Sequence, residues 1–240
     1  MSEMVRRFLR QRFFNAGVVI ALSALALFTA SQVVGSGGRA GFDAGTFALL
    51  ILSAGCVARD ATGGALQMIL CRPIRRSQYL LGRYVGILAA YAAFLLAAAG
   101  LGVVIARALL PMFGSTGPEI AWKVLGIQLL AAFLSGLATA AGVLMLSTFL
   151  PGYGDVLGFI LLTPLFALPS LAGQALRLPA LARLGDWLRE NLLPSLDWTA
   201  VLEGQHPLGA ATGRWVLALA LYLAVALLVF RRREFAYGQD

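Results

Sequence analysis

Six long apolar segments, separated by short polar stretches, run through this chain. A helix that crosses a membrane needs about 20 mostly apolar residues, and most of these segments approach or exceed that length. The predicted helices cover approximately residues 16–34, 44–58, 84–109, 124–150, 156–171 and 213–230. The pattern predicts an all-α polytopic membrane protein, with six transmembrane helices in a single transmembrane domain over residues 1–240.

Two of the six segments depart from a simple span. The segment at 44–58 is short and would need tilt or a local thinning of the bilayer. The segment at 156–171 is interrupted by Pro164 and Pro169. Asp155 stands just before that segment, after a Pro-Gly-Tyr-Gly turn, and we expect it to cap the fifth helix.

Residues 1–14, MSEMVRRFLRQRFF, are basic and amphipathic. This pattern predicts an interfacial helix that lies on the cytoplasmic leaflet. A signal peptide is the rival interpretation, because a charged start precedes an apolar run with small residues near Ala30 and Ser31. The apolar run at 16–34 is longer than the 7–15 residues usual for a signal, which favours the interfacial helix.

The segment 60–83, DATGGALQMILCRPIRRSQYLLGR, lies between the second and third predicted spans. A helical pattern places four apolar residues on one side before Pro73, namely Ala65, Leu66, Ile69 and Leu70. The segment also carries four arginines, Arg72, Arg75, Arg76 and Arg83. Because short basic loops stay on the cytoplasmic side, we expect a short amphipathic helix exposed to the cytosol.

The one long loop, residues 172–212, has a helical pattern of its own. Leucines recur at helical spacing at Leu181, Leu184, Leu188 and Leu192. Trp187 and Trp198 suit an aromatic belt at the membrane–water boundary. We therefore expect one or two short outer amphipathic helices between helices five and six, on or in the outer leaflet, with Leu184, Trp187, Leu188 and Trp198 as interfacial residues. An amphipathic lid on helices five and six is the alternative.

Composition and charge agree with a membrane protein. The chain of 240 residues is 60% hydrophobic and 12% charged, whereas a soluble domain is about 25% charged. With both termini in the cytoplasm, 12 of the 19 lysines and arginines fall on the cytoplasmic side and 7 on the outer side. The net charge of +8 is thus explained by topology rather than by nucleic-acid binding.

Reactive groups are scarce along the sequence. We find no His-Glu-x-x-His and no Gly-x-Ser-x-Gly motif, and the predicted spans hold almost no charged residue, which disfavours an ion-coupled carrier. The single lysine, Lys123, lies in Trp-Lys-Val and makes no phosphate-binding loop. Cys56 and Cys71 are expected to be reduced thiols, and with His206 they make an improbable metal site. An intramembrane enzyme is therefore disfavoured, and we expect no catalytic residue and no metal site.

The segment 60–83 resembles the cytoplasmic loop of ABC type-2 export permeases, the membrane subunits of ATP-binding-cassette exporters. The matching positions are Asp60, Gly64, Leu66, Pro73, Arg76, Tyr79, Gly82 and Arg83. The chain departs from the usual loop in having Arg59-Asp60 before the glycine and Ala65 in place of threonine. The six spans, the basic N-terminal segment, which would be the family's elbow helix, and the long outer segment also match.

The resemblance implies a coupling helix at 60–83 that docks on a separate cytoplasmic ATPase. Leu66, Ile69 and Leu70 would fit a groove on the ATPase, with Asp60 and Arg76 at its rim and Pro73 and Gly82 in the adjoining turns. A solvated basic loop that only fixes the topology is the plain alternative.

The resemblance also implies partners and location. ATP and Mg²⁺ would be bound by two ATPase copies, this chain would hold no cofactor, and a second permease chain, a copy or a relative, would complete the pathway. The protein would lie in the cytoplasmic membrane with both termini inside, with a possible extracytoplasmic partner. The rival function is a mechanical transmitter or scaffold without transport, of the metal-site maturation or gliding type.

Overall fold

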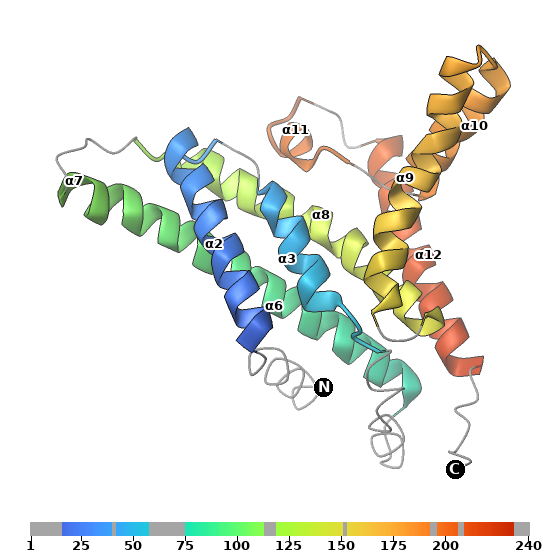
Figure 1. Ribbon diagram of the computed structural model, residues 1–240, viewed down its shortest axis with the longest axis horizontal. Coiled ribbons are helices and arrows are strands. Elements are labelled where there is room, and N and C mark those ends of the chain that lie inside the picture. The colour runs from blue at the N-terminus through green and yellow to red at the C-terminus, as the bar shows by residue number, and fades with distance from the viewer. Residues whose placement is uncertain are drawn as a thin grey trace. The chain divides into compact units, whose positions relative to one another are not determined.

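The chain is helical throughout the described regions and contains no strand there. The computed structural model describes residues 16–39, 42–57, 75–112, 119–150, 153–192, 196–205 and 209–232. The nine α-helices and one π-helix of these regions are α2 (Ala16–Ser36), α3 (Asp43–Ser53), α6 (Arg76–Val104), η1 (Ile105–Leu109), α7 (Leu110–Met112), α8 (Trp122–Phe149), α9 (Gly154–Ala175), α10 (Pro179–Leu192), α11 (Trp198–Leu202) and α12 (Ala210–Arg232). Figure 1 shows them in chain order.

Four of these helical segments are long and apolar enough to cross a membrane, and they confirm a multi-pass membrane protein. They are Ala16–Ser36, Arg76–Met112, Trp122–Phe149 and Ala210–Arg232. At 1.5 Å per residue, even a 21-residue helix such as α2 reaches about 30 Å, the thickness of the hydrocarbon core. α3 is apolar but has only 11 residues, so it falls short of that length. The predicted elbow helix at 1–14 lies outside the described residues.

Several helices differ from the sequence prediction. α3 ends at Ser53, five residues before the predicted end at 58. α6 begins at Arg76, eight residues before the predicted start at 84, because the side chain of Gln78 reaches back and its Oε1 accepts a hydrogen bond from the Arg75 N–H at 3.2 Å. α9 runs through Pro164 and Pro169 without a break, where the sequence predicted interruption. Membrane helices tolerate proline because neighbouring groups and local adjustments satisfy the freed carbonyls.

The described helices divide into two compact units. Unit 1 contains α2, α3 as far as Leu52, α6 from Gly82, η1, α7, α8 as far as Ala140, and α11. Unit 2 contains the turn after α3, the start of α6, α8 from Ala141, α9, α10 and α12.

Unit 1 is centred on Tyr91 of α6, which is 2% exposed. Its hydroxyl donates to the Ala132 carbonyl of α8 at 3.3 Å, and its ring stacks on Phe133 at 6.5 Å. The ring also closes on Gly136, where a Cβ would lie 2.9 Å from Tyr91 Cδ1 and closer still to Cε1. Tyr84, two turns earlier, donates its hydroxyl to the Leu137 carbonyl at 3.0 Å. α6 and α8 therefore pack closely because glycine leaves room for a tyrosine ring.

In unit 2, α9 and α10 form a helical hairpin, with α10 lying along α9 (Figure 1). The turn between them is a Schellman motif, in which the Leu178 N–H donates to the Gly173 carbonyl at 2.8 Å and the Arg177 N–H to the Gln174 carbonyl at 3.3 Å. Arg177 adopts φ 55° there, a conformation that usually selects glycine. Ser170 on α9 donates its hydroxyl to Asp186 on α10 at 2.7 Å. The two short helices expected within 172–212 are present as α10 and α11.

Candidate functional site

The predicted docking segment, residues 60–83, is described only from Arg75 onward. Residues 58–74 lie outside the described regions, and with them six of the predicted docking residues, Asp60, Gly64, Leu66, Ile69, Leu70 and Pro73. The remaining four, Arg76, Tyr79, Gly82 and Arg83, lie in the first turns of α6. The candidate site is therefore defined here by how the chain is held on either side of 58–74, which we call the docking segment.

On the upstream side, α3 ends at Ser53 and the chain turns over residues 54–57. The Cys56 N–H donates to the Ser53 carbonyl at 3.0 Å, and Gly55 takes a left-handed φ of 62°, which glycine adopts without strain. The N–H groups of Gly55 and Val57 point away from α3 and need acceptors, since a buried amide without a partner is costly.

Two buried side chains supply those acceptors. The Gly55 N–H donates to Oδ2 of Asp155 at 2.8 Å, and the Val57 N–H donates to Oγ of Ser147 at 3.1 Å. Asp155 lies in the first turn of α9 and Ser147 in the last turn of α8, and both are 0% exposed. A hydrogen bond to a charged acceptor is among the stronger ones in proteins, so Asp155 is the main anchor of this turn.

Asp155 differs from the sequence prediction in its position and in its partners. The N-cap of α9 is Tyr153, and Asp155 is already the second helical residue. Its Oδ1 accepts from the Val156 N–H at 2.8 Å, and a carboxylate here is favoured by the positive end of the helix dipole. Its hydrogen-bond partner Gly55 is 100 positions away in the chain, so the neighbouring sequence does not predict this bond. The sequence indicated only that an acidic residue stands at the start of an apolar helix.

On the downstream side, the first turn of α6 packs against the last turn of α12. Tyr79 is 1% exposed, and its ring stacks on Phe230 with 5.6 Å between centroids and 15° between planes. Nη1 of Arg76 donates to the Arg231 carbonyl at 3.0 Å, which satisfies one of the carbonyls that a helix end leaves without an intrahelical partner.

The four described docking residues are mostly turned inward. Tyr79, Gly82 and Arg83 are buried, and Arg83 is 5% exposed. Arg76 is half-buried. Tyr79, Gly82 and Arg83 therefore suit anchoring of the α6 start within the chain rather than direct contact with another protein.

Both anchors belong to unit 2. The docking segment thus leaves the helical body at the start of α9 and returns to it at the end of α12. A load applied to the docking segment would act on those two helix ends, because the hydrogen bonds and the ring stack fix both of its connections.

The predicted outer interfacial residues differ in their exposure. On α10, Leu184 is 50% and Trp187 59% exposed, and Leu188 is half-buried. Trp198, which was expected at the membrane boundary, is instead buried at 8% exposure, at the start of α11, where the Asp197 carboxylate accepts from the Ala200 N–H at 3.1 Å. α10 and α11 also fall in different units.

Within the described ranges, no group of three His, Cys, Asp or Glu side chains could hold a metal ion, and Cys56 is a buried cysteine outside any disulfide. Comparison with protein-family models and with curated proteins finds no match to this chain, so the multi-pass helical architecture and the two anchors are the findings on which a function is proposed.

Proposed function

We propose that this chain is the membrane-spanning permease subunit of an ABC exporter, which couples ATP hydrolysis by a separate ATPase subunit to export across the cytoplasmic membrane. The four apolar spans and the resemblance of segment 60–83 to the coupling loop of such permeases support the proposal. In it, α9 and the short α3 complete six spans, and a local thinning of the bilayer accommodates α3. Both termini are cytoplasmic, and residues 1–14 form the elbow helix.

The observation that carries the proposal is the anchoring of the docking segment at both ends. A loop that only sets the topology would need no buried carboxylate on one side, Asp155 with Gly55, and no buried ring stack on the other, Tyr79 with Phe230. Because both of its connections are fixed, a push on the segment would pass to the helix ends that hold them. Closure of two ATPase subunits on ATP would supply that push and so move the start of α9 and the end of α12.

The proposed complex holds two ATPase copies, which bind the ATP and Mg²⁺, and a second permease subunit. In this complex a groove on the ATPase contacts Leu66, Ile69 and Leu70. Burial of each of these side chains would stabilise the interface by about 1.5–3 kcal/mol. Asp60 and Arg76 lie at the rim, where charged contacts add specificity more than affinity.

The test is purification of the tagged chain from its own membranes in mild detergent, followed by measurement of magnesium-dependent ATP hydrolysis in the eluate. We expect activity with the unchanged chain and its loss in the double variant Leu66→Asp, Leu70→Asp. Gln205→Asp, an exposed position on the α11 side, is the matched control and should keep the activity. Full activity of a well-folded double variant would refute docking through these leucines.

A second candidate function, mechanical transmission to an outer partner without transport, is favoured by one feature. α10 carries Leu184 and Trp187 exposed on a hairpin that is tied to α9 by Ser170 and Asp186, so a movement of α9 would carry α10 with it. Under this alternative, Trp187→Ser would abolish binding of an outer partner and leave the ATPase association intact. Under the exporter proposal, accumulation of substrate inside cells lacking the chain is the distinguishing outcome.

A further inference from the structure

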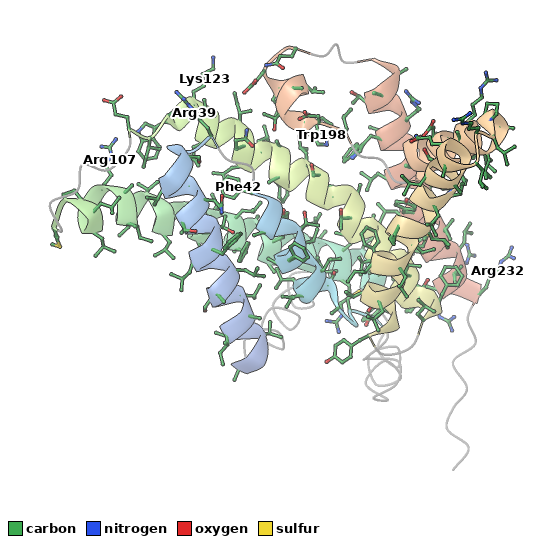
Figure 2. All side chains as sticks on the ribbon, turned by 45° about the horizontal axis from the view of Figure 1, so that its top comes forward. Arg39, Phe42, Arg107, Lys123, Trp198 and Arg232 are labelled. Carbon is green, nitrogen blue, oxygen red and sulfur yellow. The ribbon has the colours of Figure 1, made fainter. Side chains whose placement is uncertain are left out.

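Three basic side chains of unit 1 are carried by segments that meet at one end of the unit. Arg39 follows α2, Arg107 lies in η1 and Lys123 is the second residue of α8. The chain after α2 and the chain before α8 are joined by a hydrogen bond from the Ala121 N–H to the Gly37 carbonyl at 3.2 Å, and η1 packs against α2. Figure 2 shows the three side chains at the end of unit 1 where α2 ends and α8 begins.

Arg107 lies within a π-helical turn. In η1 the Leu110 N–H donates to the Ile105 carbonyl, five residues back. The guanidinium carbon of Arg107 lies over the ring of Trp122, 5.7 Å from the centroid. Single-turn π-helices are rare in proteins and occur frequently at functional sites.

Three like charges gather at this end of unit 1. Arg39, Arg107, Lys123 and Trp122 are all exposed, and among the described side chains none of the three cations takes part in an ion pair. Glu119, three residues before Trp122, is also exposed. Cations held close together repel one another, and a bound anion would relieve that repulsion.

The position of Arg39, Arg107 and Lys123 near the ends of candidate spans indicates which kind of anion they would bind. Three candidate spans have ends near these residues, at Ser36, at Met112 and at Trp122. With these helices across a bilayer, the cations would lie where hydrocarbon gives way to headgroups. Trp122, 57% exposed, is of the residue type enriched at that boundary. An anion bound at this depth is one that the bilayer itself supplies.

We propose that Arg39, Arg107 and Lys123 form a binding site for the phosphate of an anionic phospholipid headgroup, with Trp122 positioning Arg107. The site lies apart from the docking segment, and its existence does not depend on the exporter function. It gives unit 1 a fixed contact with the lipid at one membrane surface.

The test measures binding of phosphatidylglycerol to the full chain purified in neutral detergent, from the rise of its thermal-unfolding midpoint with lipid concentration. Phosphatidylcholine and inorganic phosphate are the comparison arms. We expect phosphatidylglycerol to bind the unchanged chain and the triple variant Arg39→Gln, Arg107→Gln, Lys123→Gln to bind it about 100-fold more weakly, since each basic residue near an anionic surface contributes about 1 kcal/mol.

The matched control removes three exposed arginines elsewhere, with Arg177→Gln, Arg183→Gln and Arg232→Gln, and should keep the affinity of the unchanged chain. Equal loss in this control would mean diffuse charge attraction and would overturn the site. An equal effect of inorganic phosphate would overturn the lipid as its ligand. If the triple variant does not fold, Lys123→Gln alone should weaken binding about fivefold, and no change in it would refute the proposal.

Discussion

At the scale of single residues, Asp155 is the side chain that most directly links distant parts of the chain. It accepts one hydrogen bond from the Gly55 N–H and one from the Val156 N–H while it is fully buried. Its location before the fifth predicted helix was visible in the sequence, but its partner was not. A contact between residues 100 positions apart arises only when α3 and α9 are placed in the fold, so no local pattern announces it.

We expect Asp155→Ala to lower the free energy of unfolding by about 2 kcal/mol, because it leaves the buried Gly55 N–H without its acceptor. Asp155→Asn, whose amide oxygen can still accept this bond, should lose less. Unfolding of the purified chain in detergent, followed by circular dichroism, measures both. Glu203→Ala, at an exposed position, is the control, and a loss no larger than in this control would contradict the anchoring role of Asp155.

Arg177 shows the reverse situation, a residue that the local backbone does not favour. Its φ of 55° strains a side chain with a Cβ, and the strain costs about 1–2 kcal/mol. Arg177→Gly should therefore raise the free energy of unfolding by about 1 kcal/mol. Arg177→Ala keeps the Cβ and removes the same charge, so it should leave stability nearly unchanged. The same denaturation experiment measures both, and equal effects of glycine and alanine would refute the strain.

At the scale of elements, apolar runs predicted the long helices well. The runs at 16–34, 124–150 and 213–230 correspond closely to α2, α8 and α12, because a long apolar run has few other ways to satisfy its backbone in lipid. The start of α6 was missed, although Gln78, three residues after the N-cap residue Arg75, is one sign of a helix start. The burial of Trp198 was also missed, since an amphipathic pattern does not show which side meets protein.

Small residues in a helix do not show from the sequence alone whether they face another helix of the same chain or are exposed. On α8, the Tyr91 ring of α6 occupies the space that a side chain at Gly136 would need. On α6, by contrast, the small residues Ala89, Ala93, Ala97 and Gly100 are all exposed in the single chain. Small residues thus line an internal helix contact on α8 and an exposed face on α6.

Gly136→Ala should disturb the packing of α6 on α8, because its new Cβ would meet Tyr91 at less than contact distance. Overpacking of this kind costs about 1–3 kcal/mol. Gly126→Ala on the same helix is the matched control, since nothing lies within 4 Å of a Cβ there, and it should be neutral or slightly stabilising. Thermal unfolding of the two variants compares them directly, and equal midpoints would be evidence against this contact.

At the scale of the whole molecule, hydropathy and charge predicted a multi-pass helical protein, and four candidate spans confirm it. The two-unit organisation was not foreseen, because α6 and α8 each contribute to both units and a helix pattern carries no sign of such a division. Neither the multi-pass architecture nor the division into two units indicates a function by itself. The proposed function rests on the anchored docking segment and on the resemblance of its sequence to a coupling loop.

Orientation in the membrane is a prediction at this scale, and labelling of single cysteines measures it. In a chain with Cys56→Ala and Cys71→Ser, a membrane-impermeant maleimide applied to intact cells should modify Gln205→Cys and leave Ser77→Cys untouched. Both positions are exposed in the fold, so access depends on the side of the membrane. The opposite pattern would place both termini outside and would contradict the cytoplasmic docking segment.

The most direct test of the central claim is a photo-cross-link from the docking segment itself. A photoreactive amino acid placed at Leu66 in the full chain, in living cells, should yield one covalent adduct with a protein that contains a phosphate-binding loop, identified by mass spectrometry. The same group at Gln205 should give no such adduct. Adducts from Leu66 with lipid alone, or with no ATPase under any nucleotide condition, would contradict the account.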